Sequence, residues 1–504
     1  MKPTRAPLRY VLEASFRSTF RPIPESNEKM RTRKVRAALA ALACLAALAA
    51  APPGVPAQQK IDFPVIYDTL PNGLKVVLSP DSSAPIVTVA VYYHIGFRIE
   101  PRERTGFAHL FEHLMFQGSE NLGKMEFVKL IQANGGILNG STRFDFTNYF
   151  EIVPSNTLRT MLWAEADRMR GLDITQDNLT NQQGVVKNEV RVNVLNQPYG
   201  GFPWLDMPQV ANTNWYNAHN FYGDLADIDA ATLEDARTFF HQYYSPNNAA
   251  LVVVGDFDPA QAKQWIEQYF AEIPSVERPP MPDLTEPPQA AEKRVTKKDP
   301  LAPRPALAIA YHMPQRETPE YYAMGIIDQI LLQGKDSRLY QALVQRTGLT
   351  GDVSGGINLL GNMYDYEGPM LWMASLIHDK DVSADSIMKV MDSVIAPLRS
   401  TPVDQATLDR ALVKMRSDLY DTLGGMFGFG RADLLASFAL FDSDPARINQ
   451  IEDHLRAVTP ELIQKTAEEY LRPTNRAVLI IEPGAAATPA DSTATPHSSH
   501  GRGS

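Results

Sequence analysis

The chain repeats part of itself, and this repeat limits the folds that it can adopt. The run PNNAALVVV at residues 246–254 is echoed near the C-terminus by PTNRAVLII at residues 473–481. Each run reads as a turn that enters a buried strand, and each follows a helical segment that ends near a tyrosine. Two copies of one domain are therefore expected, and about 425 residues of globular sequence are also too many for a single core.

A second echo relates one helical segment in each copy. Residues 112–118, EHLMFQG, align with residues 328–334, DQILLQG. This alignment places Gly325 opposite His109 and Gln329 opposite His113. The second copy is therefore expected to keep the helix and to lack its histidines.

The helical segment of the first copy contains the pattern H-x-x-E-H. Residues three and four positions apart share one face of a helix, so His109, Glu112 and His113 point the same way. Two neutral imidazoles one turn apart are a typical zinc pair, and a carboxylate beside them can accept a proton from the water on the metal. The pattern is that of an inverzincin peptidase. Histidines that are merely exposed or hydrogen-bonded are the alternative, but a polar triad in so apolar a helix is unfavourable unless something satisfies it.

A catalytic zinc site usually has three protein ligands, and spacing alone does not identify the third. Six carboxylates and two further histidines are available. They are Glu120, Glu126, Glu151, Glu165, Asp167, Glu189, His94 and His219.

Several runs beyond the helix make the chain resemble the pitrilysin/insulinase family of zinc peptidases. They are LPNGL at 70–74, GGILNGST at 135–142, TNY at 147–149, VVKNEVR at 185–191 and QPYG at 197–200. The resemblance covers nearly the whole chain after residue 57. It implies one Zn²⁺ per chain, held by His109, His113 and Glu189, with Glu112 as the general base of an endopeptidase. A non-catalytic core or scaffold subunit of the same fold is the alternative function.

The resemblance also implies how a peptide substrate is held. Residues 136–142 would form a sheet edge beside the zinc, and an extended peptide would pair with it as an added strand. Asn139, Gly140 and Ser141 are the expected substrate-binding residues, although a turn or strand-end role for Asn139 is equally open. Gly140 stands where the family more usually has Ala. Gln182 stands where the family often has a Glu that supports the metal site, and an amide carries no charge.

A partner chain is expected because this family closes a chamber from two halves, and this chain has the length of one half. Active members supply an Arg and a Tyr from the opposite half to stabilise the oxyanion. The corresponding positions in the run LVQRTGLTG at 343–351 are Val344 and Gly351, which have no side-chain donor. The resemblance therefore implies a heterodimer with a homologous subunit that supplies the Arg/Tyr pair.

The first 57 residues are expected to be a leader that contains a secretory signal. Residues 30–36 are basic, residues 37–51 are apolar, and small residues precede Gln58, so we expect a start at Met30 and cleavage after Ala57. This predicts a periplasmic protein. Cys44, the only cysteine, lies within the apolar run, which continues past it, so a lipoprotein anchor is the less favoured alternative.

The charge of the mature chain bears on nucleic-acid binding, and its hydropathy bears on membrane spanning. Without the 10 basic and 3 acidic residues of the leader, the totals of 48 and 58 become 38 and 55, a net charge of −17. An acidic balance does not favour nucleic acid. No stretch after the leader has the length of a transmembrane helix.

Apolar periodicity predicts the fold class. Residues 86–93 and 304–312 are expected to be strands, and residues 124–134, 156–170 and 233–243 are expected to be helices. Strands and helices do not alternate strictly, so we expect two homologous α+β domains, each a largely antiparallel sheet with helices on one face. The expected limits are 58–274 for the catalytic zinc-binding domain, 275–304 for a proline-rich linker, 305–483 for the homologous domain without metal ligands and 484–504 for a disordered tail.

Overall fold

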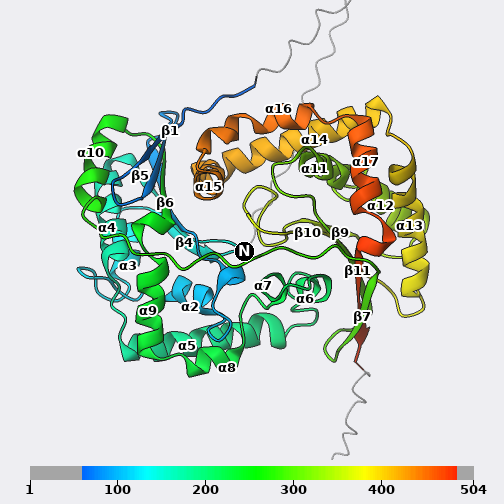
Figure 1. The fold of residues 1–504 in the computed structure, drawn as a ribbon, viewed down its shortest axis with the longest axis horizontal. Coiled ribbons are helices and arrows are strands. Elements are labelled where there is room, and N and C mark those ends of the chain that lie inside the picture. The colour runs from blue at the N-terminus through cyan, green and yellow to red at the C-terminus, as the bar shows by residue number, and fades with distance from the viewer. Residues whose placement is uncertain (1–59, 485–504) are drawn as a thin grey trace, which may run out of the picture. The chain divides into compact units, whose positions relative to one another are not determined.

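The structure is a computed structural model that describes residues 60–484 (Figure 1). The predicted leader, with Met30, Cys44 and the cleavage site after Ala57, lies outside the described residues, as does the predicted tail beyond Gly484. Within residues 60–484, no helix is both long enough and apolar enough to cross a membrane.

The first copy contains a six-stranded sheet with the strand order β1-β2-β6-β3-β5-β4. Neighbouring strands are antiparallel except for β2 and β6, which are parallel. The repeated run at 246–254 forms a turn and the strand β6, which is buried along its whole length and therefore consists of apolar residues only, apart from its last glycine. The strands are β1 (Ile66–Thr69), β2 (Lys75–Pro80), β3 (Ile86–Tyr93), β4 (Ile137–Thr142), β5 (Thr147–Pro154) and β6 (Ala249–Gly255).

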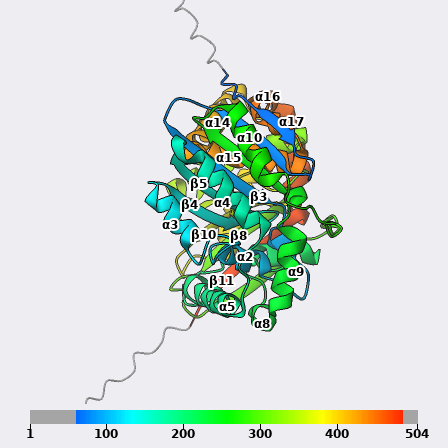
Figure 2. The same ribbon diagram turned by 90° about the vertical axis from the view of Figure 1, so that its left-hand side faces the viewer.

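Helices of the first copy cover one face of this sheet, and Figure 2 looks onto that layer. Val87, Val89 and Val91 of β3 pack in the same core as these helices, whereas Ala90 and Tyr92 point to the other face, as strand alternation requires. The main helices are α2 (Phe107–Leu114), α4 (Leu158–Arg170), α9 (Leu233–Tyr243) and α10 (Pro259–Phe270). The shorter or peripheral ones are α3 (Glu126–Ala133), α5 (Gln176–Val190), α6 (Asp206–Ala211), α7 (Trp215–Ala218) and α8 (Leu225–Ala230).

The second copy contains a five-stranded sheet with the order β7-β11-β8-β10-β9. Its strands are β7 (Lys293–Asp299), β8 (Ala306–His312), β9 (Ser354–Ile357), β10 (Leu371–Ile377) and β11 (Arg476–Pro483). Its helices are α11 (Pro319–Leu331), α12 (Arg338–Tyr340), α13 (Ala384–Ser400), α14 (Gln405–Gly424), α15 (Phe429–Ser437), α16 (Ile451–Arg456) and α17 (Pro460–Tyr470). In this sheet all strand pairs except β7–β11 are antiparallel. With one parallel pair in each sheet, the predicted α+β fold with largely antiparallel sheets is confirmed.

One helix of each copy packs on the sheet of the other copy, on the face opposite to that sheet's own helices. Helix α15 of the second copy lies against β3 and β6 (Figure 1). Phe429 at its start stacks on Phe150 of β5 with ring centroids 3.8 Å apart. Helix α6 of the first copy packs on β8 and β11, where Met207 and Ala211 share a core with Leu479. The central strands of both sheets are therefore covered on both faces.

The predicted linker needs one correction. Residues 293–299 lie inside the range 275–304 but form β7, which pairs with β11 along Ala477–Pro483. Five of the seven residues of β7 are charged and most are exposed, so the strand has no apolar alternation by which it could be recognised. β7 forms a strand because its backbone pairs with β11, which lies beside it only in the folded chain.

The two copies are joined at a fully buried arginine, Arg98. Its Nε lies 2.9 Å from Asp145 Oδ1, and its Nη1 donates to Asn217 Oδ1 at 3.0 Å and to the carbonyl of Pro369 at 2.6 Å. Asp145 in turn accepts the backbone N–H of Glu367 at 2.7 Å. One ion pair of the first copy thus fixes a loop of the second.

Replacing Arg98 with Ala should lower the free energy of unfolding by about 3–5 kcal/mol, because Asp145 would remain buried without its counter-charge. Arg304→Ala is the matched control, since its ion pair with Asp379 is largely exposed, and it should change stability by about 0–1 kcal/mol. Urea denaturation of both variants measures the difference. Equal losses in the two variants would contradict the assigned role of Arg98.

Candidate metal centre

The H-x-x-E-H pattern lies on helix α2, as predicted. The helix follows Gly106, whose φ of +81° is in the left-handed region, and it ends at Leu114. The buried carboxylate of Glu100 accepts the backbone N–H groups of Gly106, at 2.8 Å, and of Ala108, two of the donors that the first turn of a helix leaves unpaired. Burial raises the pKa of Glu100 to about 8, although these two hydrogen bonds act in the opposite direction. Glu100 therefore holds the start of the helix that carries the histidines.

Glu189 lies at the end of α5 and faces both histidines. Its Oε2 is 3.2 Å from His113 Nε2 and 3.4 Å from His109 Nε2. One ligand atom from each of the three residues lies within 4.8 Å of the other two, and within residues 60–484 no other set of His, Cys, Asp or Glu side chains meets this geometry. The structure thus brings together the three residues that the family resemblance implied.

Three carboxylates that the spacing left open are engaged elsewhere. Glu165 forms an ion pair with Arg168, and Glu151 is buried next to both of them. Asp167 accepts hydrogen bonds from Ser119 and Asn121. Glu165 and Asp167 therefore have structural partners away from the two histidines.

The titratable groups of the site shift one another's pKa values. Burial lowers the pKa of His109, but Glu112 and Glu189 outweigh it and raise the pKa to about 9. His109 and His113 hold the pKa of Glu189 well below its usual range. Burial raises the pKa of Glu112, yet His109 and the hydroxyl of Thr142 lower it overall. Two ionised carboxylates therefore face two imidazoles, an arrangement that favours a cation between them.

The donor set fits a zinc ion. Both ring nitrogens of His109 are buried and make no hydrogen bond of acceptable geometry, although carboxylate oxygens lie 3.4 Å away. Buried polar atoms are normally satisfied, so these nitrogens need a further partner. Two imidazole nitrogens and one carboxylate oxygen are the ligands that catalytic Zn²⁺ prefers in proteins.

Two side chains of the site are absent from the set predicted to act there. Thr142, the last residue of β4, donates from its hydroxyl to Glu112 Oε2 at 2.7 Å. Tyr222 lies with its hydroxyl 3.4 Å from Glu189 Oε1. Thr142 belongs to a run that contributed to the resemblance, but no spacing rule relates it to Glu112. Nothing in the sequence around Tyr222 indicated a place beside the ligands.

Strand β4 is the edge strand of its sheet, next to β5 only. Asn139 is exposed on it, Gly140 is buried against the ring of Tyr149, and the Ser141 hydroxyl donates to Asn148 Oδ1 at 2.5 Å. These positions leave the outer backbone edge of β4 without a strand partner within the described part of the chain. The predicted sheet edge is therefore present.

Gln182 is buried on α5, seven residues before Glu189. Its side-chain N–H donates to Asn181 Oδ1 at 2.8 Å. The structure thus directs this donor to a neighbouring amide. A role for Gln182 in supporting the metal site stays a prediction.

The equivalent place in the second copy is filled by other side chains. Gln329 Nε2 donates to Asp418 Oδ2 at 2.7 Å, which parallels the contact between His113 and Glu189. A Cβ added at Gly325 would meet atoms of Met363 and Met415 at 3.0–3.1 Å, so these methionines occupy the space that a histidine would need. The second copy keeps the helix and packs its former site as core.

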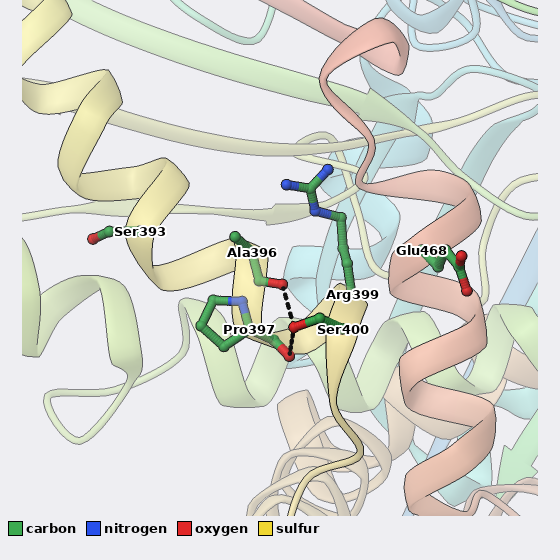
Figure 3. Close-up of a pocket in the computed structure, with 6 residues that line it drawn as sticks. All are labelled: Ser393, Ala396, Pro397, Arg399, Ser400 and Glu468. Carbon is green, nitrogen blue, oxygen red and sulfur yellow. Dashed lines mark hydrogen bonds between the residues drawn. The ribbon is translucent and has the colours of Figure 1, made fainter.

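A surface hollow on the second copy does not form a comparable site (Figure 3). It lies between α13 and α17 and is lined by residues that include Arg399, Ser400 and Glu468. The Ser400 hydroxyl donates back to the carbonyls of Ala396 and Pro397 within its own helix. The polar groups that line this hollow therefore do not converge on a common point.

Residues 60–484 form two homologous α+β copies, and among these residues only the first copy carries a metal-ligand pattern. This combination indicates the class to which the protein belongs. The family model for insulinase (peptidase family M16) matches residues 75–199, and the model for the peptidase M16 inactive domain matches residues 230–415. The chain belongs to this family, so the resemblance seen in the sequence is confirmed.

A curated relative agrees with this assignment, and solved structures agree with the fold. The zinc protease PqqE of Helicobacter pylori is 27% identical over 424 residues, which cover 82% of this chain and 92% of PqqE. The crystal structure of a protease from Helicobacter pylori superposes with a TM-score of 0.77 at 24% identity and covers 84% of this chain and 100% of that one. The periplasmic protease PqqL from Escherichia coli gives a TM-score of 0.68 at 17% identity, over 84% of this chain and 48% of PqqL.

Proposed function

We propose that this chain is a zinc-dependent endopeptidase whose single zinc ion is held by His109, His113 and Glu189. The observation that carries the proposal is the convergence of these three side chains beside Glu112, which stands on the same helix and outside the ligand set. Membership of a peptidase family and similarity to proteins named zinc proteases support it.

The side chains of the site divide the chemistry between them. A zinc ion in this position would polarise the scissile carbonyl and make a water molecule more acidic. Glu112 is ionised at neutral pH because its pKa is lowered, so it can accept a proton from water and pass it to the leaving amine. The hydrogen bond from Thr142 orients the carboxylate for this transfer.

The substrate in this proposal is an extended peptide or an unfolded segment. It would add as a strand to the free edge of β4, where Asn139, Gly140 and Ser141 present backbone groups near the C-terminal end that contacts Glu112. Backbone pairing selects for an extended shape more than for a sequence, which suits a peptidase that acts inside a closed chamber.

The proposed partner is a homologous chain in a heterodimer. Val344 lies in the π-helical turn η5 (Gln341–Arg346), and Gly351 follows in an exposed turn before β9. Neither can donate a side-chain hydrogen bond to an oxyanion. We place the complex in the periplasm, on the basis of the secretory signal that the sequence predicts in the leader.

A non-catalytic scaffold of the same fold remains the alternative function. The match to the inactive-domain model covers residues 230–415, which begin after Glu189, so it includes neither Glu112 nor any of the three proposed ligands. A scaffold would not require a carboxylate positioned by Thr142 between two potential ligands. The integrity of this arrangement supports the enzyme.

Metal analysis tests the ligand set directly. The purified chain should contain one zinc per molecule, and Glu189→Ala should lose most of it, because two imidazoles alone hold zinc weakly. Glu120→Ala, which removes an exposed carboxylate close to α2 in sequence, is the matched control and should keep the metal. Elemental analysis after dialysis gives the stoichiometry. Two zinc ions per chain, or full zinc in a His109→Ala, His113→Ala double variant, would contradict the proposal.

A further inference from the structure

Tyr222 touches two of the three proposed ligands. It is buried in the loop between α7 and α8, and its hydroxyl lies 3.4 Å from Glu189 Oε1. Its ring meets the ring of His109 edge to face, with centroids 5.2 Å apart and planes at 85°. Trp204 packs against the same tyrosine ring, with centroids 6.0 Å apart. The phenol is thus held between the metal site and the core.

A close approach between two glycines places this loop against the start of α2. Gly223 has a φ of +67°, and a Cβ there would lie 2.3 Å from the backbone nitrogen of Gly106. A Cβ on Gly106 would in turn lie 2.5 Å from the carbonyl oxygen of Tyr222. The backbone N–H of Asp224 donates to Thr105 Oγ1 at 2.8 Å, which fixes the loop to the segment that leads into α2. The position of Tyr222 is therefore set by the same backbone that sets His109.

The two oxygens of Glu189 face different groups. Oε2 is turned toward the histidine nitrogens, at 3.2 and 3.4 Å, whereas Oε1 is turned toward Tyr222. A carboxylate that has one oxygen engaged by a donor binds a metal through the other, and this leaves a coordination position open. Gln182, at the position where the family resemblance implied a supporting carboxylate, donates to Asn181.

We propose that Tyr222 is a positioning residue of the metal centre, which holds Glu189 so that it binds zinc through Oε2 alone. This inference rests on the proposed zinc site and adds a residue to it. The tyrosine acts through the ligand and does not itself bind the metal. Groups that orient metal ligands typically contribute about 10- to 100-fold to metal affinity.

Tyr222→Phe removes the hydroxyl and keeps the ring that packs on His109 and Trp204. Zinc affinity, measured by competition with a chromophoric chelator, should fall about 10- to 100-fold. The absorption spectrum of the Co²⁺-substituted protein should also change, because a carboxylate freed to bind through both oxygens alters the coordination number. Tyr216→Phe, on α7 and packed on Trp215, is the matched control and should leave both readouts unchanged.

A double-variant comparison keeps the test independent of general effects on folding. If Tyr222 acts through Glu189, Tyr222→Phe should have little further effect on Zn²⁺ affinity in a Glu189→Gln background. An equal loss in both backgrounds would overturn the inference, as would wild-type affinity and an unchanged cobalt spectrum for Tyr222→Phe. In those cases zinc binding by the wild type would leave the proposed function intact. Failure of the wild type itself to bind zinc would overturn both.

Discussion

Glu112→Gln is expected to abolish peptide hydrolysis and to leave zinc bound. Glutamine keeps the size of the side chain and can still accept a hydrogen bond from Thr142, but its amide cannot take a proton from water. A general base contributes about 10²–10⁴-fold to such a reaction, so turnover should fall by that factor. Zinc should stay at one per chain because Glu112 lies outside the ligand group.

The measurement is turnover of an unstructured peptide by the zinc-loaded complex, together with elemental analysis of the same sample. Glu120→Gln is the matched control for a change of charge near α2 and should keep full activity. Loss of zinc from Glu112→Gln would mean that this residue is a ligand. Undiminished turnover would mean that another group is the base.

The second large effect concerns the partner. Zinc-loaded protein alone should turn over a peptide at least about 10²–10³-fold more slowly than the same chain co-expressed with a homologous subunit that carries the Arg/Tyr pair, because the loss of a single oxyanion donor already costs about that factor. Val344 and Gly351 cannot replace the pair, so a homodimer would have none at either site.

The control for this experiment is co-expression with the homologous subunit after its Arg and Tyr have been replaced by Ala and Phe. That complex should assemble and remain slow, which would separate assembly from the supply of donors. Full activity from the chain alone would rule the heterodimer out.

Elements with a strong local pattern could be predicted from the sequence. Strand β3 and helix α9 have the expected limits, and the repeated runs form β6 and β11 after matching helices. The face shared by His109, Glu112 and His113 followed from helix geometry. Glu189 did not, because several carboxylates have acceptable spacing, and only the family resemblance selected it.

What escaped prediction depends on contacts between distant segments. Strand β7 is a strand only because β11 lies beside it, and its own residues are charged. Tyr222 reaches Glu189 because two glycines allow the loop to touch the start of α2. Neither fact leaves a periodicity or a spacing that could be read from the chain alone.

Helix α6 of the first copy packs on the second sheet, and helix α15 of the second copy packs on the first sheet. This packing suggests a reason why a copy without metal ligands is retained. Separation of the copies at the linker would uncover Ala90, Tyr92 and Val252 on the first sheet and Ala308 on the second. Such apolar sheet surfaces promote aggregation. The second copy can therefore do without metal ligands, as Gly325 and Gln329 show, but it has to keep the surface that packs on the first copy. Selection can act on it as a solubility partner of the copy that carries the histidines, built into the same chain.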